Sequence, residues 1–146
     1  MFGKFKEKLT GAFSRLNGRT DLLEAIAAAC ALVSAADGEL EDEEAASTLD
    51  ALTNHPTLSK AFKVSEIERV TDAMMKRAKG GMAGRLGLKR EIEQAKAKSS
   101  TEDLEMLLVI AIDVSMSDGQ MEPQERKVLD QIATSLGLNL RTYLDA

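Results

Sequence analysis

Two stretches of the chain share one outline: "SAADGELEDEEA" at residues 34–45 and "SMSDGQMEPQER" at residues 115–126. Each follows an apolar run, contains Asp-Gly, and has a Glu seven residues after the Asp, where a second amphipathic run begins. Glycine commonly ends a helix, and acidic residues are favoured in the first turn of the next one. The repeat therefore predicts two helix–turn–helix units related by pseudo-twofold packing.

The composition predicts an all-α fold. A chain of 146 residues can form a single compact domain with a proper core. It has no Trp, one Tyr and two Pro. Its abundant Ala, Leu, Glu, Lys and Met favour helix, and β-branched runs of strand length are scarce.

Apolar spacing places the expected helices. They cover about residues 21–36, 42–52, 65–79 and 85–98, with one more opening at the Ser100–Asp103 capping pair and a last one from Pro123 to a stop at Gly137. Residues 79–84 are Gly-rich and are expected to be a flexible joint. Residues 106–112 are apolar on every side, so we expect this helix to be the buried axis of the domain. Asp113 interrupts that run and needs a partner or a water-facing position.

Three single residues receive structural interpretations. Cys30 is the only cysteine, cannot form an internal disulfide, and is expected to be a small core residue. His55 precedes a proline in a polar turn and is interpreted as a surface residue. Met82, like two methionines shortly before it, is interpreted as core filler.

A basic amphipathic segment, residues 1–19, is expected to precede the helical domain of residues 20–146. Phe2, Phe5 and Phe13 recur at helical spacing with Lys between them. Residues 1–16 therefore suit either contact with an anionic membrane or partner groove, or a helix packed on the domain. The first twenty residues carry +4, which leaves −9 on the rest of a chain whose total is −5.

These charges and hydropathy limit the classes of partner and location. An acidic body repels nucleic acid, so a nucleic-acid role is not expected. The longest apolar run is far shorter than the roughly 20 residues that span a bilayer, and no signal peptide is visible. We therefore expect a cytoplasmic protein.

The repeated acidic turn has a structural explanation for most of its residues. Each Gly can end the preceding helix, and each later Glu falls at the third helical position if Glu41 or Glu122 is the N-cap. The aspartates are not explained in this way. Asp37 and Asp118 follow helix C-termini, where a negative charge is unfavourable by a few tenths of a kcal/mol. A bound cation would reverse the sign of that interaction.

Side-chain oxygens also recur at matching positions in the two turns. The residues concerned are Asp37, Glu39, Glu41 and Glu44 in the first turn, and Asp118, Gln120, Glu122 and Glu125 in the second. Oxygens at alternate positions of a loop suit a hard cation such as calcium. The spacing is not that of an EF-hand, and zinc is not expected because no Cys or His lies nearby in the sequence. The competing interpretation is a solvated acidic surface with good helix caps.

The same segments carry a family resemblance. The stretches "ACALVSAADGELEDEE" and "DVSMSDGQMEPQERKVLDQIATSLGL" resemble the two signature segments of the TerB tellurite-resistance family, and "MFGKFKEKLTGA" is similar to its N-terminus. The resemblance implies an all-helical domain of about seven helices with paired halves, and an acidic surface that binds divalent cations, with calcium the first candidate. Carried over by residue, the implied metal ligands are Asp37, Glu41, Glu44, Asp118, Glu122 and Glu125, while positions 39 and 120 are variable in the family pattern.

The resemblance also implies a biological setting. The family belongs to bacterial stress systems that give resistance to tellurite, some phages and colicins. Its members act at the inner face of the inner membrane, beside the integral membrane partner TerC and other Ter-system proteins. An alternative is a plain helical interaction domain without metal, like the TerB-like modules attached to J-domain co-chaperones.

An enzyme is not expected. The sequence does not bring a nucleophile, a base and an orienting group together. Tellurite is an anion that an acidic body repels, and its reduction would need thiols or a redox cofactor for which one cysteine offers no basis. We therefore expect a non-enzymatic, cation-responsive adaptor.

Overall fold

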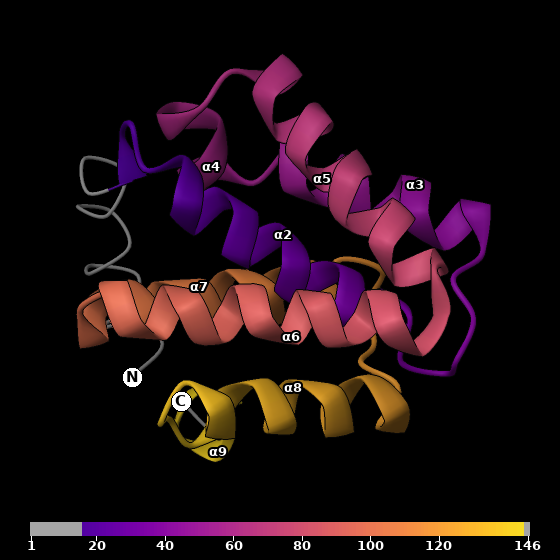
Figure 1. Ribbon diagram of the computed structural model, residues 1–146. Coiled ribbons are helices and arrows are strands. Elements are labelled where there is room, and N and C mark those ends of the chain that lie inside the picture. Colours follow the sequence, from indigo (N-terminus) through magenta and orange to yellow (C-terminus); the bar gives the residue numbers. More distant parts are fainter. Residues whose placement is uncertain (1–15, 145–146) are drawn as a thin grey trace.

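The fold is all-α, as predicted. The computed structural model describes residues 16–144, and within that range it contains helices and no strands (Figure 1). The helices are α2 (Thr20–Ser34), α3 (Asp42–Thr53), α4 (Pro56–Ala61), α5 (Val64–Lys79), α6 (Gly81–Lys98), α7 (Thr101–Ser115), α8 (Pro123–Ser135) and α9 (Leu140–Leu144). Six of these eight have 12 or more residues, close to the seven helices expected.

Helix α2 is the centre of the domain. It packs against α3, α5, α6, α7 and α8, and its residues are buried almost continuously from Leu22 to Val33. Five alanines on α2 are each no more than 1% exposed: Ala25, Ala27, Ala28, Ala29 and Ala31. Because alanine side chains are short, neighbouring helices approach α2 closely from several sides.

The expected buried axis needs a correction. Residues 106–112 of α7 are all buried, as predicted. The helix at the centre is nevertheless α2, which packs against helices from both halves of the chain. Both helices are apolar on every side, but much of the buried surface of α2 comes from alanines, whereas residues 106–112 contain larger apolar side chains.

The helices form layers around α2. Helices α5 and α6 pack against each other on one side, α3 and α7 contact each other on another, and α8 contacts α2, α6 and α7. The turns that follow α2 and α7 lie at the same end of the molecule, on the right in Figure 1. Pseudo-twofold packing of the two halves stays a prediction, as does the domain boundary after residue 19.

Local signals set several helix boundaries as expected. The Ser100 hydroxyl accepts the Asp103 N–H at 3.2 Å, and the Asp103 carboxylate accepts the Ser100 N–H at 3.3 Å, which makes a capping box at the start of α7. Helix α8 begins at Pro123. Gly137 follows it with a φ of 77°, in the left-handed region that ends helices.

The expected flexible joint at residues 79–84 is wrong in most of its length. Helix α5 ends at Lys79 and α6 already begins at Gly81, so only Gly80 separates the two helices. Gly84 lies inside α6 because the helix runs directly against the backbone of α5. A Cβ at Gly84 would overlap the carbonyl oxygen of Arg77. The Gly-rich composition thus serves close packing of two helices and not flexibility.

The interpretation of His55 as a surface residue is also wrong. The residue is 8% exposed and caps α4 by accepting the Thr57 N–H on Nδ1. Its Nε2 lies 3.0 Å from Asp113 Oδ2, on α7. Because Nδ1 is an acceptor, Nε2 carries the proton and donates it. Asp113 thereby has the partner that its position required, and the pair ties the α3–α4 turn to α7.

Replacement of His55 by alanine is expected to lower the free energy of unfolding by about 1–3 kcal/mol, because it removes the cap and leaves the carboxylate without its partner. Chemical denaturation measures this directly. The variant Asp113→Asn is the control, since its amide oxygen still accepts the Nε2–H and should cost less. Equal costs for the two variants would contradict the assigned hydrogen bond.

The methionines differ from expectation in one case. Met74 and Met75 are buried, each 4% exposed, as core filler should be. Met82 is 76% exposed at the start of α6, so its interpretation as a core residue is wrong. Of the N-terminal segment, the structure describes only its last residues, and Leu16 is fully buried. The predictions for residues 1–15 lie outside the described residues.

Candidate functional site

Each acidic turn begins with a helix stop of the expected kind. Helices α2 and α7 end at Ser34 and Ser115, and each is followed after a short turn by a left-handed glycine. Gly38 has a φ of 96° and Gly119 a φ of 106°. Such angles are strained for any other residue, which explains why both turns keep glycine after the aspartate.

The glutamates begin the next helices. Glu41 is the N-cap of α3, and its N–H donates to Glu44 Oε1 at 3.4 Å. Glu122 is the N-cap of α8, and its N–H donates to Glu125 Oε1 at 2.8 Å. Both pairs form capping boxes. The structural explanation of these four residues is therefore confirmed, and it does not by itself exclude a second role.

The aspartates are less constrained. Asp37 is exposed, and its Oδ1 accepts the Glu39 N–H at 3.1 Å, which closes a local turn. Asp118 is also exposed. A lysine side chain lies beside the first turn. Lys79 Nζ, on α5, is 2.7 Å from Asp42 Oδ1. This hydrogen bond and the positive charge of Lys79 lower the pKa of the Asp42 carboxyl.

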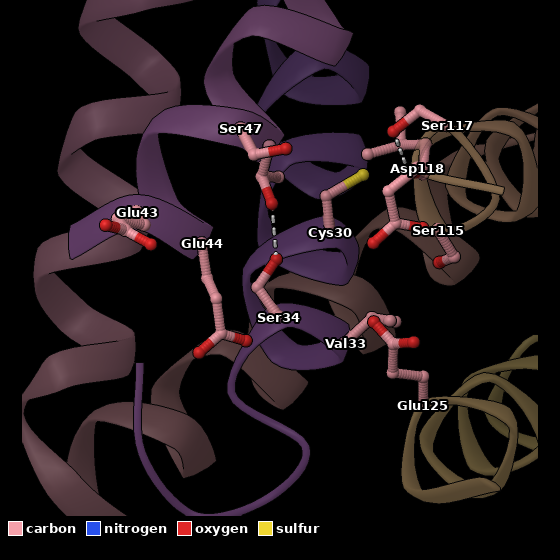
Figure 2. A pocket seen from close by; sticks show the side chains of 12 residues that line it. Cys30, Val33, Ser34, Glu43, Glu44, Ser47, Ser115, Ser117, Asp118 and Glu125 are labelled. Carbon is pink, nitrogen blue, oxygen red and sulfur yellow. Dashed lines mark hydrogen bonds between the residues drawn. The ribbon is translucent and has the colours of Figure 1, made fainter. Parts of the chain in front are cut away.

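A pocket of about 200 Å³ lies between the two turns, and we call it the acidic pocket (Figure 2). It is formed by the ends of α2 and α7 and the beginnings of α3 and α8. Its lining residues are Cys30, Val33, Ser34, Glu43, Glu44, Ser47, Thr48, Val114, Ser115, Ser117, Asp118 and Glu125. Carboxylates and hydroxyls thus surround a small apolar floor.

The acidic pocket brings together three of the six candidate ligands: Glu44, Asp118 and Glu125. The other three, which are the first aspartate and the two N-cap glutamates, do not line it. Figure 2 shows Glu44 and Glu125 on opposite sides of Ser34 and Val33. Residues from the two repeats, far apart in the chain, therefore share one site.

The electrostatics of the acidic pocket disfavour negative charge. Burial raises the pKa of Glu125, and the charges of Asp118, Glu122 and Glu44 raise it further. Burial likewise raises the pKa of Glu44, with added contributions from Asp37 and Glu41. In both residues the capping hydrogen bond from the backbone acts in the opposite direction. The charge of Glu44, from the first turn, is the smallest of the causes that raise the pKa of Glu125 in the second turn.

The carboxylate and hydroxyl oxygens of the acidic pocket are of the type that binds hard cations, but their positions do not form a coordination shell. Carboxylate and hydroxyl oxygens are the ligands that calcium and magnesium prefer. Within residues 16–144, however, no three His, Cys, Asp or Glu side chains converge closely enough to hold a metal ion. A cation in the acidic pocket would therefore require rotation of Glu44, Asp118 or Glu125, of which Asp118 is the most exposed.

The thiol of Cys30, which lines the acidic pocket, has low reactivity. Cys30 is 2% exposed, and burial raises its pKa to about 12. A thiol with such a pKa is almost entirely protonated near neutral pH, so it is a poor nucleophile and a poor metal ligand. The expectation that Cys30 is a core residue is confirmed.

Comparison with known protein families shows to which family the chain belongs. The model of the family described as "Tellurite resistance protein TerB" matches residues 23–146. The chain belongs to the TerB family. The match includes both acidic turns and every helix from α3 to α9. No curated protein and no solved structure gave a match.

Among the helices in the described part of the chain, none combines the length and the apolar character needed to cross a bilayer.

Sequence reasoning missed several pocket residues of the TerB-family domain. Glu43 and the hydroxyls of Ser34, Ser115 and Thr48 were not singled out, although all of them line the acidic pocket. Ser34 and Ser115 carried a signal, since each stands three residues before the Asp of its turn. Thr48 carried none, because its 2.7 Å hydrogen bond to Ser34 depends on how α3 packs against α2.

Proposed function

We propose that this TerB-family domain is a non-catalytic, cation-responsive adaptor of a bacterial tellurite-resistance and stress system. The observation that carries the proposal is the shared acidic pocket. Glu44 and Glu125 come from different repeats, line the same pocket, and both have raised pKa values. A site in which burial and neighbouring charges disfavour carboxylate ionisation gains from a counter-ion.

Calcium is the proposed ion, held by Glu44, Glu125 and Asp118. Carboxylates supply charge to a divalent cation, and the pocket hydroxyls with water supply further oxygens. When bound, such an ion would neutralise the carboxylates and link the start of α3 to the α7–α8 turn. The surface that a partner meets would then depend on the ion.

We extend the proposal to partners and location as the family resemblance implies. The partner is an integral membrane protein such as TerC, with other Ter-system proteins, at the inner face of the inner membrane. The basic residues of segment 1–16 provide a peripheral membrane contact by attraction to anionic lipid. An enzymatic role is not proposed, since the pocket thiol is protonated and buried.

Calcium is expected to stabilise the wild-type domain in thermal melts and to release or absorb heat in titration calorimetry. At a concentration 100 times the dissociation constant, the gain is about 2.7 kcal/mol, which raises Tm by roughly 5–10 °C. The variant Glu44→Gln/Glu125→Gln should lose this gain. Glutamine is also a capping-box residue, so the variant removes the two charges and keeps the caps.

The matched control is Glu68→Gln/Glu93→Gln, which removes two exposed charges from α5 and α6, outside the acidic pocket. It should retain the full calcium response. If wild type and the pocket variant respond equally, or if neither responds, the cation site is wrong.

The pH dependence has a definite sign. Because the folded-state pKa values of Glu44 and Glu125 are raised, these groups are most favourable to folding while protonated, below their unfolded-state values. Without calcium, their contribution to the free energy of unfolding falls as the pH rises from the unfolded through the folded pKa values. Protons compete with calcium, so the calcium-induced rise in Tm should shrink as the pH is lowered from 7 towards 4.

This dependence is measured by melts at several pH values with calcium or with a chelator. The variant Glu44→Gln/Glu125→Gln should show a flatter profile in chelator. A calcium effect that grows as the pH falls would contradict carboxylate ligation.

A second candidate is a protein-interaction domain without metal. The capping boxes favour it, because they already give Glu44 and Glu125 a structural task. This candidate predicts identical melting temperatures in calcium and in chelator, so the same melts decide between the two.

A further inference from the structure

Helix α6 presents an exposed face that the packing of the domain does not use. We call it the α6 face: Met82, Leu86, Lys89, Arg90, Glu93 and Ala97. Met82 is 76% exposed and Leu86 47% exposed. Their spacing of four residues places them side by side on the helix surface. They are two of only four large apolar side chains exposed within residues 16–144.

Positive charge accompanies these apolar side chains. Lys89 and Arg90 are exposed on the next turn, and neither forms an ion pair with the described residues. Residues 76–98 contain eight Lys and Arg against two Glu, in a chain that is acidic as a whole. One of the two, Glu91, is engaged by Arg77 at 3.0 Å. The α6 face therefore combines apolar contact with attraction for anions.

The shape of the α6 face favours a planar partner. Neither Met82 nor Leu86 lines the acidic pocket or the groove of about 280 Å³ between α6 and α8. Their side chains project from the helix into solvent, and of the α6 face only Lys89 lines the groove between α6 and α8. Protruding apolar side chains flanked by Lys and Arg are typical of helices that lie in the interface of an anionic membrane.

The α6 face and the acidic pocket are built from different residues. Helix α6 is not among the main neighbours of α3 or α7, but it contacts α8, which contributes Glu125 to the pocket. In Figure 1, α6 crosses the front of the molecule and α7 passes behind it. The residues that would meet a negatively charged surface are therefore distinct from those that line the acidic pocket.

We propose that the α6 face docks on the surface of an anionic lipid bilayer. Met82 and Leu86 enter the headgroup region, and Lys89 and Arg90 contact lipid phosphates. The inference deepens the membrane part of the proposed function, adding a second contact to segment 1–16. It does not depend on the acidic pocket, so it is tested in the presence of a chelator.

The first experiment locates the face that meets the bilayer. A fluorophore sensitive to polarity is attached to Met82→Cys in the full chain. Selective labelling is practical because Cys30 is buried and has a pKa raised to about 12. The control carries the label at Ala46→Cys, an exposed position on α3. Vesicles of phosphatidylcholine with phosphatidylglycerol are added, and vesicles of phosphatidylcholine alone serve as the neutral comparison.

The label at position 82 should shift to shorter wavelength with anionic vesicles only, and the label at position 46 should not shift. If the protein binds the vesicles while the position 82 label stays in water, the α6 face is wrong and segment 1–16 alone accounts for binding. If no binding occurs, the membrane proposal fails as a whole. Neither outcome affects the calcium melts.

The second experiment measures the contribution of charge. Each basic residue near an anionic surface contributes about fivefold to the partition coefficient, so Lys89→Glu/Arg90→Glu should weaken vesicle binding at least 25-fold. The matched control, Lys63→Glu/Arg69→Glu, makes the same change at two exposed positions near the start of α5. It should weaken binding far less. Equal losses for both variants would show only a response to net charge and would overturn the assignment to α6.

Discussion

Gly84→Ala is expected to destabilise the domain by about 3 kcal/mol, which corresponds to a fall in Tm of roughly 10 °C. The new Cβ would overlap the carbonyl oxygen of Arg77, which belongs to the backbone of α5. Backbone does not rotate away, so α5 and α6 must separate. Alanine gains about 1 kcal/mol over glycine inside a helix, and the packing loss must exceed that gain.

Gly87→Ala is the matched control, three residues along the same helix. Its Cβ would meet only the Arg77 guanidinium, at 2.8 Å from Nη2. That group is the end of a flexible side chain and can move, although it holds Glu91 at 3.0 Å. Gly87→Ala should therefore stay within about 1 kcal/mol of wild type in chemical denaturation. A Gly84→Ala variant as stable as Gly87→Ala would show that α5 and α6 are not in backbone contact.

Ile26→Ala is expected to cost about 4 kcal/mol, because it opens a cavity at the centre of the domain. Ile26 is fully buried on α2. The surrounding helices already pack closely against the alanines of α2, so they have little room to collapse into the vacated space. Such sites fall at the costly end of large-to-small substitutions.

The conservative variant Ile26→Val removes one methylene and should cost about 1 kcal/mol. Denaturant unfolding with a common slope compares the two variants. A cost of less than about 1 kcal/mol for Ile26→Ala would contradict the central position of α2.

The sequence predicted what depends on local signals. Residues only a few positions apart determine the Ser100–Asp103 capping box, the start of α8 at Pro123 and the left-handed glycines. Such signals act within one or two helical turns, and the structure confirms them. The all-α fold follows from the same local preferences.

The errors involve contacts between distant residues. His55 is buried because Asp113, 58 positions away, receives its hydrogen bond. Position 84 needs glycine inside a helix because a Cβ there would overlap the Arg77 carbonyl oxygen of the neighbouring helix. Met82 is apolar yet exposed, because no described element covers the start of α6. A single sequence does not show directly which distant residues become neighbours when the helices pack.

The candidate site was partly accessible from the sequence. The repeat identified Glu44, Asp118 and Glu125, which the fold brings to one pocket. It also suggested Asp37 as an equivalent of Asp118, but only Asp118 lines the pocket. Sequence equivalence of two turns does not make their surroundings equivalent, because the helices packed beside each turn differ.

The enclosure of α2 has a consequence for how the protein is made. Among the described residues, the helices that cover it all follow it in the chain, and they include α7 and α8, which are synthesised late. A nascent chain that stops before α7 would leave one flank of α2 in water, so native folding must wait until the C-terminal helices leave the ribosome. Neither repeat should survive alone as an expressed fragment, and the domain should fold and be degraded as a single cooperative unit.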